Sequence, residues 1–307
     1  MTELLPGFAA RRIATSGAEI HCVVGGKGPP LLLLHGYPQT HVMWHRVAPR
    51  LAESFTVVCS DLRGYGDSAK PDGGANHVNY SKRAMAADQV ELMRALGFAR
   101  FRLAGHDRGA RVAHRLCLDH PDAVERVAVL DISPTHTMYA STNKAFATAY
   151  FHWFFLIQPF DFPEKLIGAD PVYILRRMLG GLGGGLATFD PRALAEYERC
   201  FADPATIHAT CEDYRAAASI DLEHDAADIA AGRRVTCPLL ALWGEKGVVH
   251  RLFDPLCDWG AVATDVRGKA LPAGHFLAEE APEVTLAELL AFFGARTRPP
   301  LSAATGR

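Results

Sequence analysis

Short, mostly apolar runs recur along the chain and constrain its fold more than any other feature. They lie at Pro30–Leu34, Phe55–Cys59, Phe101–Ala104, Val127–Leu130 and Pro238–Trp243. Strands that are apolar at every position are buried on both faces, as in a parallel sheet covered by helices on each side. The sequence therefore predicts an α/β fold built on a mostly parallel, doubly covered sheet.

The segments between the runs predict helices and an insertion. Three of them suit crossover helices: Met43–Ala52, Ser81–Leu96 and Arg108–Asp119. After Ser133 the strand rhythm stops, and aromatic, Pro-punctuated helical stretches continue to Asp228. We therefore expect a helical cap subdomain at residues 133–231, inserted into a core domain made of residues 1–132 and 232–307.

Composition excludes several classes of protein. The 307 residues are 49% hydrophobic, enough for a large core, and carry a net charge of −2 with a pI near 6.7. Scattered charges of this kind give no reason to expect nucleic acid or a membrane surface as partner. Residues 1–17 contain no long apolar stretch, and the odd number of cysteines without C-x-x-C spacing favours free thiols. We expect a soluble cytoplasmic protein with no disulfide framework and no zinc site. The cysteines are Cys22, Cys59, Cys117, Cys200, Cys211, Cys237 and Cys257.

The segment from Leu103 to Gly109 has the strand, tight turn and helix pattern of a nucleophile elbow. Asp107 stands where a lipase or esterase carries serine, with Gly105 and Gly109 as the small residues that the strained turn needs. The helix N-terminus beside the turn favours anions, so the carboxylate stays ionised. A carboxylate that attacks a saturated carbon displaces a leaving group and forms an alkyl ester. Asp107 therefore predicts displacement at an sp³ carbon.

An ordinary turn with a helix-capping Asp would give the same local pattern, but two further features favour catalysis. The backbone N–H groups of Tyr37, which follows a buried strand, and of Arg108 are expected to form an oxyanion hole. His275 follows a short strand and precedes the final helix, which is the position of the general base in the order nucleophile, acid, histidine.

The acid that orients His275 has two candidates. Asp131 is a charge in the otherwise apolar run Val129–Ser133, where it needs a partner, and we assign it as the third triad member. Glu245 follows the next apolar run and is the alternative, because Gly244 stands where such enzymes often carry Asp.

Three motifs resemble the fluoroacetate dehalogenase family of α/β hydrolases: His106–Arg111, Asp61–Ser68 and Phe151–Phe155. The resemblance covers nearly the whole chain. Epoxide hydrolases and haloalkane dehalogenases share the Asp elbow and the second motif, so these two features are typical of the superfamily. The narrower signature is Arg108 with Arg111, together with His and Trp in the cap motif and a later cap tyrosine.

The resemblance implies that Arg108 and Arg111 bind the substrate carboxylate, and that His152, Trp153 and Tyr214 surround the halogen. Their chemistry agrees with these roles. The arginines are three residues apart at the start of one helix, and paired guanidiniums suit a carboxylate. N–H and O–H donors stabilise the negative charge that develops on a leaving fluoride.

One departure from the family pattern concerns the glycine-rich run at residues 180–185, which we expect to be a flexible turn between cap helices. Leu182 stands where the family often has tryptophan, so this wall of the pocket is smaller. Chloroacetate or 2-halopropionate is therefore expected to enter as well.

The sequence predicts hydrolytic dehalogenation of a short 2-haloacid, fluoroacetate to glycolate and fluoride, through an aspartyl ester. No metal or organic cofactor is implied, and the resemblance suggests a homodimer. An epoxide hydrolase is the main alternative, since Tyr150, Tyr173 and Tyr197 could protonate an epoxide oxygen. A non-catalytic receptor for a small ligand on the same fold is a second alternative.

Overall fold

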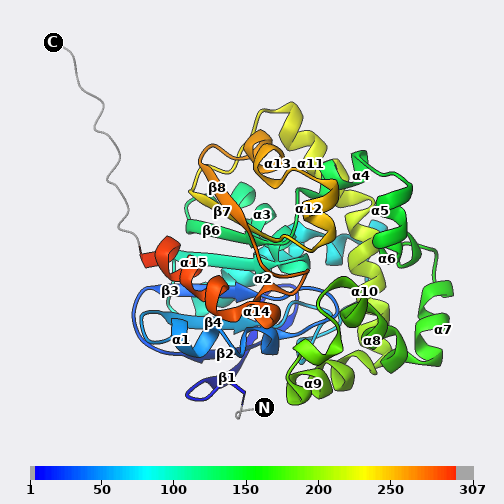
Figure 1. Cartoon of the computed structure of the whole chain (residues 1–307), viewed down its shortest axis with the longest axis horizontal. Coiled ribbons are helices and arrows are strands. Elements are labelled where there is room, and N and C mark those ends of the chain that lie inside the picture. The colour runs from blue at the N-terminus through cyan, green and yellow to red at the C-terminus, as the bar shows by residue number, and fades with distance from the viewer. Residues whose placement is uncertain (1–3, 295–307) are drawn as a thin grey trace.

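The structure, a computed structural model, describes residues 4–294 and is built on one 8-stranded sheet (Figure 1). The strand order is β1-β2-β4-β3-β5-β6-β7-β8, and β2 is antiparallel to both neighbours while all other pairs are parallel. The predicted mostly parallel sheet is confirmed. The strands are β1 (Ala9–Ala14), β2 (Glu19–Gly25), β3 (Pro30–Leu34), β4 (Thr56–Ser60), β5 (Phe101–His106), β6 (Val124–Leu130), β7 (Leu239–Gly244) and β8 (Val266–Leu271).

The central strands form where the sequence is mostly apolar. All four leucines of β3 are fully buried, and β3 pairs with β4 on one side and β5 on the other. The antiparallel strands β1 and β2 were not predicted, because β1 is almost entirely exposed and lacks an apolar pattern. The carboxyl ends of β3, β5 and β6 meet at one edge of the sheet, where parallel α/β folds place their sites.

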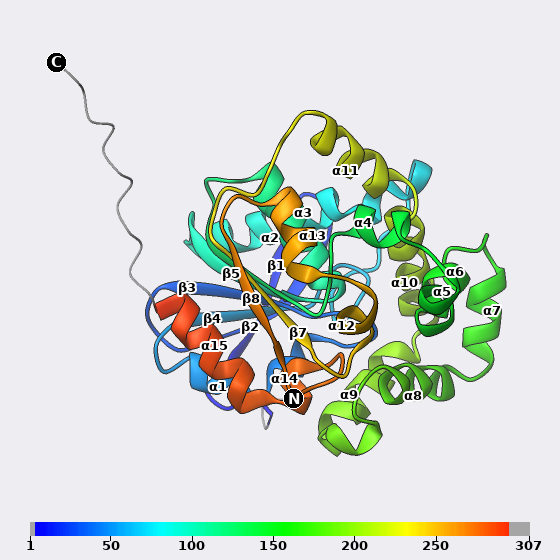
Figure 2. The same ribbon diagram turned by 45° about the horizontal axis from the view of Figure 1, so that its top comes forward.

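Helices cover both faces of the sheet. α1 and α15 contact each other on one face, and α2 and α3 contact each other on the opposite face (Figures 1 and 2). Among the described residues, no helix is both long and apolar enough to span a membrane. The helices outside the β6–β7 connection are η1 (His41–Trp44), α1 (Ala48–Leu51), η2 (Ala75–Tyr80), α2 (Lys82–Ala95), α3 (Arg108–Asp119), α12 (Val248–Leu252), α13 (Pro255–Val262), α14 (Leu277–Glu280) and α15 (Pro282–Gly294).

The helix predicted at Met43–Ala52 is wrong as a single element. The segment instead forms η1, which Thr40 caps, and the short α1. A continuous helix would place Pro49 in its interior, where proline removes a hydrogen bond and clashes with the preceding turn. The predictions for α2 and α3 are confirmed, the first to within one residue at each end.

The connection between β6 and β7 is entirely helical. In Figures 1 and 2 most of its helices gather at one side of the molecule, and α11 lies at the edge of this group, where it contacts α4 and α10. The glycine-rich run does not begin as a turn: α8 continues through Gly180 and Gly181 to Leu182, and the irregular stretch starts at Gly183. Helix packing therefore overrides glycine's weak helix propensity there. These helices are α4 (Thr135–Ala140), α5 (Lys144–Ala149), α6 (Phe151–Phe155), α7 (Phe162–Ala169), α8 (Pro171–Leu182), η3 (Leu186–Thr188), α9 (Pro191–Phe201), α10 (Pro204–Ala217) and α11 (Ile220–Ala230).

Candidate active site

Asp107 lies on the sharp turn between β5 and α3. Its backbone has φ 45° and ψ −115°, a left-handed conformation that is costly for a residue with a Cβ. A Cβ on Gly105 would lie 2.5 Å from the carbonyl oxygen of Gly109, and one on Gly109 would lie 2.4 Å from that of His35. The elbow therefore requires both glycines, as its sequence pattern predicts.

The side chain of Asp107 is buried and accepts a hydrogen bond from the backbone N–H of Tyr37, at 3.0 Å. Burial by itself would raise the pKa of Asp107, but the nearby His275 and Arg111 outweigh it and lower the pKa to about 2. The carboxylate is therefore ionised at neutral pH, as a nucleophile must be. The structure thus brings the predicted nucleophile and one predicted oxyanion donor together.

His275 and Asp131 form a hydrogen-bonded pair. Nδ1 of His275 lies 2.6 Å from Oδ2 of Asp131, whose Oδ1 accepts the backbone N–H of Gly244 at 2.9 Å. Burial would lower the pKa of His275, and the bond to Asp131 reverses this effect and raises it. Glu245, the alternative acid, is exposed, so the geometry favours Asp131.

His106 supports the same histidine and was not singled out from the sequence. Its Nε2 atom donates to the backbone carbonyl of His275 at 2.8 Å, and the two rings lie 4.6 Å apart. Burial lowers the pKa of His106 to about 3, so it is neutral. Its place next to the nucleophile is the only signal in the sequence that could have identified it.

The two predicted arginines differ in their surroundings. Arg108 is fully buried and forms a two-point ion pair with Asp213: Nε lies 2.9 Å from Oδ2, and Nη2 lies 2.7 Å from Oδ1. Arg111 donates from Nη1 to the hydroxyl of Thr135 at 2.9 Å, and its guanidinium lies 4.6 Å from the ring centroid of Trp153. Sequence reasoning missed Asp213, which lies beside the predicted Tyr214 in a helix with no local sign of a partner.

The three predicted halide ligands, hereafter the halide cradle, come from α6 and α10: His152, Trp153 and Tyr214. Their rings are neighbours, with centroids 5.8 Å apart for His152 and Tyr214 and 6.5 Å apart for Trp153 and Tyr214. His152 Nδ1, Trp153 Nε1 and the Tyr214 hydroxyl are all buried and lack a hydrogen-bond partner within residues 4–294. Burial lowers the pKa of His152 to about 3, so its imidazole is neutral. Unpaired buried polar groups are costly. The indole N–H and the phenol hydroxyl are donors, and Nδ1 of His152 is a donor in one of the two neutral tautomers, so the three groups together suit an acceptor.

Leu182 lies beside His275. Its backbone carbonyl accepts the N–H of His275 at 3.2 Å, and its side chain is half-buried against the core. The end of α8 thus contacts the loop that carries His275.

The cap tyrosines considered for epoxide chemistry are dispersed. Tyr150 is buried with its ring 6.3 Å from that of His275, whereas Tyr197 donates to Glu279 at 2.6 Å and Tyr173 is 62% exposed. Of these three tyrosines, Tyr150 alone lies close to His275 and has a hydroxyl with no hydrogen-bond partner among the described residues.

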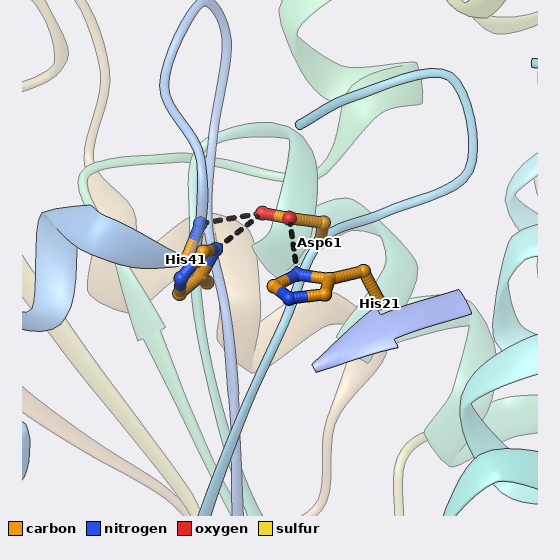
Figure 3. Close-up of side chains that lie close together, drawn as sticks. All are labelled: His21, His41 and Asp61. Carbon is orange, nitrogen blue, oxygen red and sulfur yellow. Dashed lines mark hydrogen bonds and ion pairs between the residues drawn. The ribbon is translucent and has the colours of Figure 1, made fainter. Parts of the chain in front are cut away.

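A separate cluster of metal-ligand residue types lies at His21, His41 and Asp61 (Figure 3). Each imidazole Nδ1 lies 2.9 Å from an oxygen of Asp61, which also accepts the backbone N–H groups of His41 and Asp67. The histidines and backbone thus use the carboxylate oxygens that would bind a cation. We interpret the cluster as a hydrogen-bonded anchor of the loop that follows β4.

Known proteins share this architecture. Residues 29–268 match the model of the alpha/beta hydrolase fold family. The chain is 51% identical to a fluoroacetate dehalogenase from Burkholderia sp over 92% of each chain, and 37% identical to a soluble epoxide hydrolase from Corynebacterium sp. (strain C12) over 91% of this chain and 94% of the relative. The crystal structure of ALR0039 from Nostoc sp PCC 7120 superposes with a TM-score of 0.93 at 58% identity, covering 95% of this chain and 100% of that one. The chain belongs to the α/β-hydrolase superfamily and, within it, to the haloacetate dehalogenase family.

Proposed function

We propose that this protein is a hydrolase that cleaves the carbon–halogen bond of a short 2-haloacid, converting fluoroacetate to glycolate and fluoride. The observation that carries the proposal is the halide cradle, whose three buried polar groups lack partners in the described chain and lie near an ionised Asp107. Tyr37 links the two groups: its backbone N–H binds Asp107, and its ring centroid lies 6.0 Å from that of His152 and 5.3 Å from that of Tyr214. The likeness to a fluoroacetate dehalogenase supports the same substrate class.

In the first step, one carboxylate oxygen of Asp107 attacks the α-carbon of the bound acid. The new carbon–oxygen bond forms as the carbon–halogen bond breaks, and the halide leaves with the bonding electron pair. Donors in the halide cradle stabilise this charge as it develops, while Arg108 and Arg111 hold the substrate carboxylate. A glycolyl ester on Asp107 results.

In the second step, His275 takes a proton from water, and the resulting hydroxide adds to the carbonyl carbon of the ester. The backbone N–H groups of Tyr37 and Arg108 stabilise the oxyanion. Collapse of this intermediate expels glycolate, whose alkoxide oxygen receives the proton from His275. Asp107 is released as an acid and ionises, so the net products are glycolate, halide and one proton.

We further propose the domain organisation, the cellular location and the oligomeric state of the protein. Residues 133–231 form a cap subdomain that supplies the halide cradle, and residues 1–132 and 232–307 form a core that supplies the triad; positions 1–3 and 295–307 lie outside the described residues. All seven cysteines are free, in keeping with a cytoplasmic location. Exposed apolar side chains of the cap favour a homodimer. They are Phe151, Phe160, Phe162, Leu166 and Tyr173.

Ion-selective electrodes test the proposal directly. Release of fluoride from fluoroacetate and of chloride from chloroacetate is measured in separate assays of the purified protein, and Asp107→Asn serves as the control. We expect release of both halides by the unmodified protein and none by the variant. Release of chloride alone would contradict a working cradle for fluoride. If neither halide appears, the dehalogenase proposal is wrong, and diol formation from epoxides would identify the alternative that the Corynebacterium relative suggests.

A further inference from the structure

A buried row of alternating charges, hereafter the charge chain, leads away from Arg108. Asp213 pairs with both Arg108 and Lys82, and Lys82 pairs in turn with Asp221 at 3.2 Å. The side chains of all four residues are at most 4% exposed. Buried charges are retained only when partners compensate them, and here two cations and two anions alternate.

The charge chain fixes the orientation of Arg108. Nε and Nη2 of its guanidinium donate to the carboxylate of Asp213, and Nη2 also donates to the Asp213 backbone carbonyl at 2.9 Å. The guanidinium carbon lies 4.1 Å from the ring centroid of Tyr214, a member of the halide cradle. Nη1 is buried and has no partner in residues 4–294. One end of the guanidinium is thus held and the other is left free beside the cradle.

Asp213 is itself held from more than one side. The hydroxyl of Tyr65 donates to its Oδ2 at 2.6 Å, and Lys82 pairs with its Oδ1. Both oxygens of Asp213 are therefore committed, and its carboxylate is a fixed support rather than a mobile counterion.

Arg111 presents the opposite case. Its hydrogen bonds go to uncharged groups, which are the hydroxyl of Thr135, the backbone carbonyl of Ser133 and the thioether sulfur of Met138. Its Nε lacks a partner among the described residues. No carboxylate in the described chain forms an ion pair with it. The positive charge of Arg111 is thus left uncompensated by direct pairing, whereas that of Arg108 is balanced by Asp213.

We propose that Asp213 is a positioning residue for substrate binding: it cancels the charge of Arg108 and directs Nη1 at the substrate carboxylate, while Arg111 supplies the net attraction. This inference rests on the proposed function, because it assigns the carboxylate-binding step of the same site. A positioning role and a purely electrostatic role predict opposite effects on anion binding when Asp213 is removed. If charge alone mattered, removing the negative Asp213 would strengthen anion binding, whereas loss of orientation weakens it.

The test compares two double variants with the same net charge as the unmodified protein. Asp213→Asn with Lys82→Met removes the support of Arg108, whereas Lys82→Met with Asp221→Asn removes the outer pair and one contact to Asp213 but keeps the contacts between Asp213 and Arg108. We expect the first to raise KM for fluoroacetate roughly tenfold or more, as for loss of a charged hydrogen bond. Its kcat should change less, and calorimetric binding of glycolate should weaken by a similar factor. The second leaves Arg108 paired with Asp213 and removes one support of that carboxylate, so we expect it to raise KM by roughly threefold or less.

Equal or lower KM in the first variant, with thermal unfolding confirming its fold, would overturn the positioning role. If that variant does not fold, Tyr65→Phe removes a single donor to Asp213 and is expected to raise KM by roughly threefold. An unchanged KM there would also overturn the inference. If the unmodified protein releases no halide, the proposed function fails and the inference fails with it, whereas halide release with unaffected variants defeats the inference alone.

Discussion

Nδ1 of His275 lies 2.6 Å from Oδ2 of Asp131, although 144 residues separate them in the chain. The sheet explains this proximity, because Asp131 directly follows β6 and His275 follows β8, with β7 between them. The backbone N–H of Gly244, at the end of β7, donates to the other oxygen of Asp131. Three neighbouring strand ends therefore hold one imidazole in place, and its chemistry leads to the first two predictions.

Replacing His275 with alanine should stop the reaction after its first step. The ester on Asp107 still forms, because attack by the carboxylate does not use the imidazole, but water is no longer activated. We expect a burst of one halide per active site and then turnover slowed by roughly a thousandfold or more. Rapid-quench halide measurement and mass spectrometry of the intact protein would detect the burst and the ester. Absence of both, in a folded variant, would contradict the assignment of roles.

The rate of ester hydrolysis should depend on pH through His275. A general base must be unprotonated. Burial lowers the pKa of His275 less than Asp131 raises it, so its pKa lies above the ordinary histidine value. The rate should therefore increase with pH, with an inflection above roughly 6.5. In Asp131→Asn the inflection should move to lower pH, with a large loss of rate. Single-turnover measurements across pH would show this. An inflection that does not move in Asp131→Asn would argue against the pairing as its cause.

Substitutions in the halide cradle should affect fluoride more than chloride. Fluoride is the poorer leaving group and gains more from donors as charge develops. Trp153→Phe and Tyr214→Phe each remove a donor that forms no hydrogen bond within the described chain. Neither substitution therefore leaves another protein group unpaired. We expect the ratio of kcat/KM for fluoroacetate over chloroacetate to fall by roughly tenfold in each. Equal losses for both substrates would indicate a packing role instead.

Leu182→Trp should narrow the substrate range. The residue ends α8 beside the loop of His275, and a larger side chain there would reduce the space available to a substituted α-carbon. We expect kcat/KM for 2-chloropropionate to fall by roughly tenfold or more while that for fluoroacetate changes little. Leu182→Ile, which preserves volume, is the matched control. A parallel loss for both acids would place Leu182 outside the pocket wall.

Glu279 should make the fold sensitive to alkaline pH. Burial raises its pKa to about 8, although Tyr197 donates to it at 2.6 Å. In the folded protein Glu279 therefore keeps its proton over a pH range in which the unfolded chain loses it. The resulting contribution to the free energy of unfolding is complete below roughly pH 4 and is lost as pH rises through about 8. Glu279→Gln should be more stable than the unmodified protein above that pH, by about 1–3 kcal/mol. Thermal unfolding at several pH values would test this, and identical pH profiles would refute it.

The sequence predicted the parts of the molecule that depend on local pattern. The bounds of β3 and α3 were predicted residue for residue, because a fully apolar run and a helix that starts at the elbow leave little freedom. The elbow itself could be identified from Gly105 and Gly109. A single helix at Met43–Ala52 and a turn starting at Gly180 were wrong, since proline geometry and packing against neighbouring helices decided those segments.

Relations between distant residues were harder to predict. The pairing of Asp131 with His275 could be inferred, because strand order and an isolated charge in an apolar run both point to it. The partner of Arg108 could not, because Asp213 lies 105 residues away on a cap helix and its sequence resembles an ordinary helix surface. The support from His106 to the His275 carbonyl depends on loop geometry that no spacing reveals.

The two ends of the helical connection lie next to each other, because β6 and β7 are hydrogen-bonded neighbours. The segment between them can therefore change in length or sequence without altering the register of the sheet that holds Asp107, Asp131 and His275. In the proposed mechanism the nucleophile, its base and the two arginines belong to the sheet and α3, while the groups that bind the leaving atom belong to this segment. Replacement of one contiguous stretch of chain can therefore change the preferred leaving group and keep the rest of the site.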